Sequence, residues 1–490
     1  MDVVGAEPLQ VETTTRRVPL IRWTHGLVNR CVMLSDASAL ILGTALTWHP
    51  GDASAIRLTL PQGLVIGLIA AVGWLGVLRR AGAYRVERYR RPARVAADVA
   101  LGSLSGSLLS GLVVAVFADT LHNLPRILVG MGEVLGVVVA ARLGVAVVVG
   151  MVLRRRLLRA KVAVIGANPE GLAVLCHLSG PAMADRFEIV GLYRDDHETV
   201  LPSPGLFAGV LSGDVEELGR YAQFNPVDLI VVCIPWPSAE RRQEVIEAVQ
   251  WIAADVVIPI GGIDQPIPNA QVATIGGLQT LQVLHRPFKG TQGLLKVAED
   301  YLVGGVALLI ASPLMLLVAL AIRLDSPGPA LFRQARTGFN NQTFMIFKFR
   351  TMLVDPSDDG SVGTTRPDHP RITRVGGLLR RLSIDELPQL LNVMRGEMSV
   401  VGPRPYVPNM LVGQSRFTDS VRQYAARHRI KPGITGWAQA NGLRGNALRT
   451  LEGARRSVAL DMYYITHWSL LFDLQIMLRT VMVLVGRNVF

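Results

Sequence analysis

The sequence is poor in cysteine and in charged residues. Its 490 residues include three cysteines, and charged residues make up 18% of the chain. Cys31, Cys176 and Cys233 lie far apart, without the spacing of zinc ligands or the density of a disulfide framework. No internal repeat or long low-complexity tract is evident. These absences argue against a disulfide scaffold, a zinc module and a repeat protein.

Long apolar segments are abundant instead. Hydrophobic residues make up 50% of the chain, and its mean hydropathy of +0.35 is high for a soluble protein. Each of four segments approaches or exceeds the ~20 residues needed to cross a bilayer, although the first contains Asp36. These are residues 31–48, 60–78, 98–118 and 127–153. The sequence therefore predicts a four-helix transmembrane bundle over residues 31–153, preceded by a tail of residues 1–30.

Basic residues are concentrated in alternate loops of this bundle. They precede the first segment, separate the second from the third and follow the fourth, whereas the opposite loops hold little beyond Arg57 and Arg126. The positive-inside rule then places the tail and both ends of the bundle in the cytoplasm. We expect no cleavable signal peptide, because thirty polar residues precede the first segment. The net charge of +12 suggests anionic lipid rather than nucleic acid as the partner, since no nucleic-acid motif accompanies it.

The middle of the chain, residues 160–285, has the alternating pattern of a parallel sheet with crossover helices. A short apolar strand, Val162 to Ile165, runs into the turn Gly166-Ala-Asn-Pro-Glu-Gly171 and a helix, and further strands are predicted at 187–192, 227–234 and 256–260. This predicts a Rossmann-like domain with a short sheet. The dinucleotide fingerprint is partial, because Asn168 replaces the middle glycine. A scaffold or homodimerisation role and regulatory nucleotide binding both remain open.

Two adjacent acids, Asp385 and Glu386, stand where a helix is expected to begin. One interpretation is a capping box, with Ser383 as N-cap and Glu386 reaching back to it. The other is a diphosphate site with a metal, because basic side chains that suit phosphate recognition surround the acids in the sequence. These are Lys348, Arg350, Arg380, Arg381 and Arg404.

The motifs of residues 291–490 resemble those of the bacterial sugar transferases, the polyprenyl-phosphate glycosyl-1-phosphate transferases. They are Leu324-Asp-Ser-Pro-Gly-Pro329, Lys348-Phe-Arg-Thr-Met352, Leu382-Ser-Ile-Asp-Glu-Leu-Pro-Gln-Leu390, Arg395-Gly-Glu-Met-Ser-Val-Val-Gly-Pro-Arg-Pro405, Ile430-Lys-Pro-Gly-Ile-Thr-Gly-Trp-Ala-Gln439 and Asp461-Met-Tyr-Tyr464. With the bundle and the Rossmann-like middle, the whole chain resembles the large membrane-bound members. One small departure is Lys296-Val297, where the family often has a basic pair.

The resemblance implies an α+β phosphoglycosyl transferase domain over residues 291–490. Residues 298–323 of this domain would form a re-entrant membrane helix. A kinked spanning helix is the alternative from hydropathy alone. Basic residues at both ends give the helix no preferred direction, and a crossing would carry the phosphate site away from cytoplasmic nucleotide sugars. We expect a break at Ser312 and Pro313, with Ser312 bonding the carbonyl that proline frees. Residues 468–485 predict either an interfacial amphipathic helix or a core helix.

The implied activity is transfer of a sugar 1-phosphate from a UDP-sugar to polyprenyl phosphate, with release of UMP. Asp385 would be the covalent nucleophile and Glu386 the ligand of Mg²⁺. Lys348, Arg350, Arg381 and Arg404 would bind substrate phosphate, and Gly433 and Gln439 the nucleotide. The sequence does not identify the sugar.

Two other classes of protein remain as alternatives. One is a membrane-tethered nucleotide-sugar oxidoreductase or dehydratase centred on Gly166 to Gly171, but a Tyr-x-x-x-Lys pair does not follow the predicted sheet. The other is a non-enzymatic component for polysaccharide assembly or transport. The scarcity of charge in the four apolar segments argues against a pore.

Overall fold

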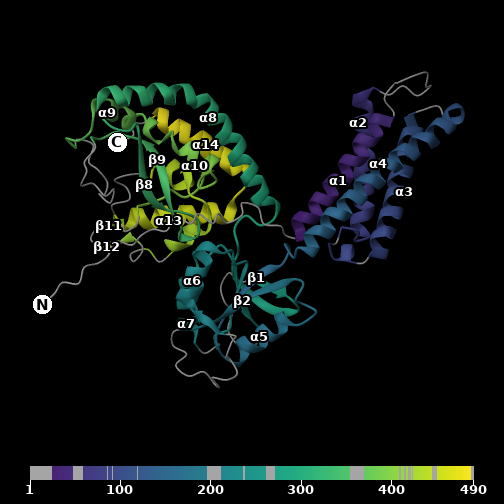
Figure 1. Ribbon diagram of the computed structural model, residues 1–490, viewed down its shortest axis with the longest axis horizontal. Coiled ribbons are helices and arrows are strands. Elements are labelled where there is room, and N and C mark those ends of the chain that lie inside the picture. The colour runs from purple at the N-terminus through teal and green to yellow at the C-terminus, as the bar shows by residue number, and fades with distance from the viewer. Residues whose placement is uncertain are drawn as a thin grey trace. The chain divides into compact units, whose positions relative to one another are not determined.

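The computed structural model divides the chain into two compact units, Arg22–Arg159 and a second containing Ala160–Phe490 (Figure 1). The residues that the structure describes are 25–47, 59–84, 86–90, 92–117, 120–195, 211–235, 238–260, 271–353, 369–407, 410–412, 415–417, 421, 423–443 and 450–486.

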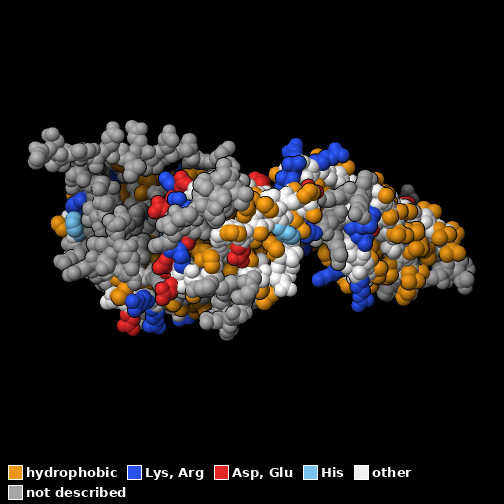
Figure 2. Space-filling view, turned by 90° about the horizontal axis from the view of Figure 1, so that it is seen from below, with side chains coloured by type: hydrophobic (Ala, Val, Ile, Leu, Met, Phe, Trp, Pro, Cys, Tyr) orange, Lys and Arg blue, Asp and Glu red, His pale blue; other side chains and the backbone are white. Residues whose placement is uncertain are grey.

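The first unit is the predicted four-helix bundle. Its helices are α1 (His25–Thr47), α2 (Leu60–Arg80), α3 (Pro92–Phe117) and α4 (Thr120–Arg154), with a short 3-10 helix η1 (Val86–Arg90). All four are long and apolar enough to span a membrane. The first begins at His25, inside the segment expected as tail. Figure 2 shows hydrophobic side chains covering much of the bundle's visible surface, as lipid contact requires.

The acid in the first apolar segment has a buried partner. Asp36 is fully buried, and Nη2 of Arg142 lies 2.8 Å from its Oδ2. The Arg142 guanidinium also lies 5.1 Å from the ring centre of Trp74. Because charges inside a membrane require compensation, this pair explains how an apolar helix tolerates Asp36.

The second unit begins with a seven-stranded sheet of order β3-β2-β1-β4-β5-β7-β6. Neighbours are parallel except for the β5–β7 and β6–β7 pairs, which are antiparallel. The Rossmann-like prediction is confirmed, but the sheet is longer than expected because β3 extends it at one edge and the β6–β7 hairpin at the other. The strands are β1 (Ala160–Ile165), β2 (Phe187–Arg194), β3 (Leu211–Asp214), β4 (Leu229–Val232), β5 (Asp255–Pro259), β6 (Gln271–Ile275) and β7 (Leu278–Leu284); the helices are α5 (Pro169–Ser179), α6 (Val215–Phe224) and α7 (Ala239–Val249). We call this part the middle domain; dimerisation through it stays a prediction.

The rest of the second unit is an α+β domain, here called the transferase-like domain. It has an antiparallel hairpin β8–β9, a parallel pair β10–β13 and a small antiparallel pair β11–β12. Its elements are α8 (Thr291–Asp325), β8 (Leu331–Thr337), η2 (Phe339–Asn341), β9 (Thr343–Phe349), α9 (Arg374–Arg381), η3 (Ile384–Glu386), α10 (Gln389–Met394), β10 (Ser399–Val401), β11 (Leu411–Val412), β12 (Ser415–Arg416), η4 (Ala425–Arg429), β13 (Gly433–Thr435), α12 (Trp437–Ala440), α13 (Leu451–His467) and α14 (Leu470–Gly486).

Helix α8 is continuous through Pro313, so the expected interruption at Ser312 and Pro313 is wrong. Figure 1 shows instead a bent helix that arches over the domain. Ser312 donates to the carbonyl of Leu309 at 2.8 Å, as predicted, because this is the carbonyl that a proline at position 313 cannot bond. The bond lets the helix bend without ending. In the described part of the chain, α8 is also the fifth helix that is apolar and long enough to span a membrane.

Both ends of α8 are attached to the same domain. Near its start, Asp300 accepts hydrogen bonds from Ser399 Oγ at 2.7 Å and from the Val400 amide at 3.0 Å. At its end, Arg350 donates to the carbonyl of Ser326 at 2.7 Å. Between these points Leu309, Ile310, Leu316 and Leu317 are exposed. The middle of the helix therefore presents an apolar surface while its ends stay with the folded domain.

Helix α14 combines the two properties expected of residues 468–485. Asp473 is fully buried, 2.6 Å from the Lys296 ammonium, and accepts from the Trp468 indole at 2.9 Å. Leu471 and Met482 are exposed. One face of the helix thus packs in the domain and the other is apolar and open.

Candidate active site

The two adjacent acids lie in a separate turn between two helices. Ser383, after α9, has a left-handed backbone with φ of 56°, and residues Ile384–Glu386 form one 3-10 turn. Pro388 follows, and α10 begins only at Gln389. The capping-box interpretation is wrong, because Ser383 makes no side-chain cap and the proline delays the α-helix. The two acids therefore do not form the start of α10.

Glu386 binds two basic side chains from other elements. Its Oε1 lies 3.1 Å from Lys348 Nζ, on β9, and accepts from Arg404 Nη2 at 2.6 Å. Its Oε2 accepts from Arg404 Nη1 at 3.3 Å. Both nitrogens of the Arg404 fork thus face one carboxylate, the geometry typical of strong charge-assisted pairs. The structure brings together three residues that the sequence proposed for one site.

Asp385 lies beside this cluster and is partly buried. Burial first, and the neighbouring Glu386 second, raise its pKa to about 6. Lys348, Arg380 and Arg404 oppose that rise. At neutral pH the carboxylate is therefore mostly ionised, and it combines burial with negative charge. A partly buried anion close to several cations has the properties of a nucleophile for a phosphate ester.

Two arginines near the dyad had no role in the activity that the family resemblance implies. Arg380 lies close enough to lower the pKa of Asp385 and donates through Nε to Thr351 Oγ1 at 2.8 Å, whereas Arg381 is exposed. Arg336, on β8, has its pKa lowered to about 10 by burial and by Arg404, an effect that Glu386 opposes. Strand alternation could have found Arg336. It is four residues from Phe332, the register partner of Lys348, and so shares that face.

Three other proposed residues have structural roles here. Arg350 is buried and donates to carbonyls at the end of α8, those of Ile322, Ser326 and Pro327. Its guanidinium therefore closes the end of α8.

Gly433 and Gln439 are also buried, so their positions do not favour contact with a nucleotide. Gln439 Nε2 donates to the carbonyl of Ile434 at 3.3 Å. A Cβ on Gly433 would lie 2.1 Å from the Gly402 amide nitrogen. Glycine is needed there because β13 approaches closely the segment that leads to Arg404.

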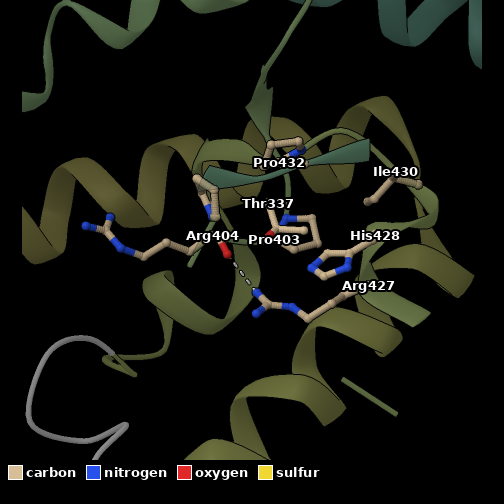
Figure 3. A pocket seen from close by; sticks show the side chains of 9 residues that line it. Thr337, Pro403, Arg404, Arg427, His428, Ile430 and Pro432 are labelled. Atoms are coloured by element: carbon tan, nitrogen blue, oxygen red, sulfur yellow. Dashed lines mark hydrogen bonds between the residues drawn. The ribbon is translucent and has the colours of Figure 1, made fainter. Parts of the chain in front are cut away.

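Behind Arg404 lies a small pocket with an empty volume of about 180 Å³ (Figure 3). Figure 3 shows the Arg404 side chain pointing away from it, while the Arg404 carbonyl faces Arg427. Arg427 Nη2 donates to that carbonyl at 3.0 Å and lies 2.7 Å from Asp461 Oδ2. Arg427 and Asp461 are almost completely buried. The pocket lining comprises Thr337, Gly338, Pro403, Arg404, Pro405, Arg427, His428, Ile430 and Pro432.

Within the described residues, no group of three or more His, Cys, Asp and Glu side chains is arranged to hold a metal. The dyad nevertheless offers two adjacent carboxylates in a basic setting. Mg²⁺ usually takes one or two carboxylates together with substrate phosphates and water, so this donor set fits it better than zinc.

Comparisons with known proteins assign the fold. Residues 291–487 match the family described as bacterial sugar transferase, and residues 79–258 match the one described as CoA-binding domain. A UDP-glucose:undecaprenyl-phosphate glucose-1-phosphate transferase of Klebsiella pneumoniae is 32% identical over 350 residues, which are 69% of this chain and 73% of that protein. The chain belongs to the bacterial sugar transferase family.

Two further relatives are also similar in sequence to this sugar transferase. An undecaprenyl-phosphate glucose phosphotransferase of Komagataeibacter xylinus is 40% identical, over 67% of this chain and 59% of its own length. A UDP-glucose:undecaprenyl-phosphate glucose-1-phosphate transferase of Escherichia coli K12 is 35% identical, over 60% and 61%. The chain thus spans about three fifths of the length of these two relatives.

Proposed function

We propose that this sugar transferase moves a sugar 1-phosphate from a UDP-sugar to undecaprenyl phosphate, giving undecaprenyl-diphospho-sugar and UMP. The observation that carries the proposal is the convergence of Lys348, Arg380 and Arg404 on the Asp385–Glu386 pair. Such a set of cations suits a diphosphate, whose negative charge increases on the leaving group as a phosphorus–oxygen bond breaks.

The proposed mechanism has two displacements at one phosphorus. A carboxylate oxygen of Asp385 attacks the sugar-bearing phosphorus, and the bond to the bridging oxygen breaks so that UMP leaves with its electron pair. A phosphate oxygen of undecaprenyl phosphate then attacks the same phosphorus and releases the Asp385 carboxylate. Arg404 and Lys348 stabilise the phosphate oxygens in both steps, and the raised pKa of Asp385 reflects a weakly solvated carboxylate.

Glu386, with Asp385 beside it, would hold Mg²⁺ when substrate is bound. The ion would neutralise diphosphate charge and favour departure of UMP.

We also propose that α8 enters the bilayer and returns to the same side. This is supported by the attachment of both its ends to one domain and by the exposed leucines between them. The site would then lie at the cytoplasmic face of the inner membrane, where a soluble UDP-sugar and a lipid phosphate can meet. Cysteines placed at 85, 290 and 360 should all be labelled from the cytoplasm. Labelling of position 360 from the periplasm would contradict this topology.

The experiment for the reaction is UMP release by the purified full-length protein with undecaprenyl phosphate and a panel of UDP-sugars. Because the three relatives above are named for glucose transfer, we expect UDP-glucose to be used best, ahead of UDP-galactose and UDP-N-acetylgalactosamine. No UMP from any of them would refute the proposal. Reduction of bound NAD with a nucleotide sugar would favour an oxidoreductase, and lipid-independent sugar flux across liposomes a transport component.

A further inference from the structure

Three consecutive side chains of η4 contact three different parts of the second unit. Arg429 reaches the middle domain, His428 reaches the turn of the β8–β9 hairpin, and Arg427 reaches the segment that carries Arg404. All three are buried. The element thus lies between the middle domain and the active site.

The contact with the middle domain centres on one short loop, residues 252–254, between α7 and β5. The His285 carbonyl and the end of α6 also take part. Arg429 donates to the carbonyl of Ile252 at 3.3 Å and to that of Ala254 at 2.7 Å. From the hairpin turn, Asn340 Oδ1 accepts from the Ala253 amide at 3.2 Å. One backbone group on each of three consecutive residues is therefore held by two side chains of the transferase-like domain.

The hairpin turn and η4 are also joined to each other. His428 Nδ1 is hydrogen-bonded to Asn341 Oδ1, next to Asn340. Burial and Arg427 lower the pKa of His428 to about 3, so the ring is neutral and can donate one hydrogen bond to the amide oxygen without introducing charge. The hairpin and η4 consequently face the middle domain as one assembly.

The same assembly continues to the dyad. Arg427 lies 4.4 Å from the Tyr406 ring centre and 5.5 Å from that of Tyr424, which limits its movement, and its Nη2 holds the Arg404 carbonyl. Arg404 in turn donates both Nη atoms to Glu386. A displacement of η4 would therefore move the backbone of Arg404 relative to the carboxylates.

We propose that the middle domain sets the position of Arg404 at the dyad through η4. Arg427 and Arg429 are then positioning residues of the transferase, and Asn340 assists them from the hairpin turn. The expected change in kcat rests on the proposed function, whereas the expected structural coupling between the middle domain and Arg404 does not. In this way the middle domain contributes to turnover without touching a substrate.

The test uses the full-length protein with Arg429→Gln and the milder Asn340→Ala, each confirmed to be folded by thermal unfolding. Because Arg404 acts on charge that develops during the reaction, we expect kcat for UMP release to fall about tenfold and KM to change less than about twofold. Lys289→Gln is the matched control. It removes a 2.7 Å ion pair with Asp255, directly after the held loop, without touching η4, and we expect kcat within about twofold of wild type.

A double-mutant cycle separates positioning from loss of stability. If Arg429 acts through Arg404, the effect of Arg429→Gln on kcat disappears when Arg404→Lys is already present. The same loss in both backgrounds would overturn the proposal.

Hydrogen exchange of residues 402–407, measured without substrate, provides the second readout. Exchange should be faster in Arg429→Gln and Asn340→Ala than in Lys289→Gln, and unchanged exchange would also overturn the proposal. An inactive wild type would refute the proposed reaction alone, since exchange tests the coupling independently.

Discussion

The glycine turn of the middle domain and the turn that carries the dyad both have the sequence signs of a phosphate site, but their surroundings differ. In the first, the Asn168 side chain accepts from the Gly171 amide at 2.9 Å and donates to the Cys233 carbonyl at 2.6 Å. A Cβ on Gly166 would lie 2.3 Å from that carbonyl. The glycines and Asn168 thus hold the turn against β4, and the helix N-terminus receives its cap from the chain itself.

The dyad turn differs because side chains from separate elements bring charge to it. Lys348 comes from β9, Arg380 from α9 and Arg404 from the segment after β10, and all act on two adjacent carboxylates. Placing like charges side by side raises the free energy of the folded state, so a functional role explains the pair better than stability does. Converging charge, rather than a glycine pattern, therefore marks the proposed reactive site in this chain.

Asp385→Asn should have the largest effect. The amide has nearly the same shape, so folding and membrane association should be retained, but it is not a nucleophile. We expect UMP release to fall by at least ~1,000-fold. Wild type given UDP-sugar without undecaprenyl phosphate should show a burst of UMP and a phosphosugar adduct on Asp385, detectable by mass spectrometry.

The control for that experiment is the deamidation state of the variant. Substantial turnover by a preparation shown to contain only Asn at position 385 would refute the covalent mechanism. The dyad turn would then be as inert chemically as the glycine turn.

Glu386→Gln should have the next largest effect on activity. It removes the charge that pairs with Arg404 and Lys348, and with it the proposed Mg²⁺ ligand, so we expect a loss of ~100-fold in kcat/KM. The residual rate should rise with Mg²⁺ concentration above that needed by wild type, measured by titration of the metal. Equal Mg²⁺ dependence of the two proteins would exclude Glu386 as a metal ligand.

The sequence predicts the features of this chain that depend on local pattern. Hydropathy identified the four bundle helices, and the alternation of strands and helices identified most of the middle sheet. The dyad with Lys348 and Arg404 followed from chemistry and family resemblance, because charges of both signs are needed at a diphosphate. The β6–β7 hairpin was missed because no crossover helix joins its antiparallel strands.

What the sequence did not predict depends on contacts between distant residues. Arg429 meets the loop at Ile252 across 177 positions, and Asn340 meets Ala222 across 118. Nothing in the local pattern of Arg350 distinguishes a cation that closes α8 from one that binds phosphate. Pro313 was expected to interrupt its helix, but Ser312 bonds the Leu309 carbonyl and the helix continues.

Gly166→Ala tests the other side of the comparison. Gly166 has φ of +118°, where a side chain is strained, and its Cβ would collide with the Cys233 carbonyl. We expect a loss of ~1–3 kcal/mol of stability in the middle domain and lower yield of folded protein. The folded fraction should keep kcat within about threefold of wild type, since the turn is not catalytic. A large loss of kcat in fully folded protein would contradict a scaffold role.

Asn168→Ala should have the smallest effect and distinguishes a self-capped turn from a regulatory nucleotide site. It removes the cap acceptor of the Gly171 amide and the donor to Cys233, at a cost of ~1 kcal/mol. Amides of α5 should exchange faster in the full-length protein, while UMP release stays within about twofold of wild type. Asn168→Ser is the matched variant. Serine also caps helices, so it should restore part of the protection of α5 although it is too short to replace the amide donor. If added NAD or CoA changes UMP release by wild type and this response is lost in Asn168→Ala but kept in Lys289→Gln, the glycine turn binds a regulator and its likeness to the dyad turn is functional after all.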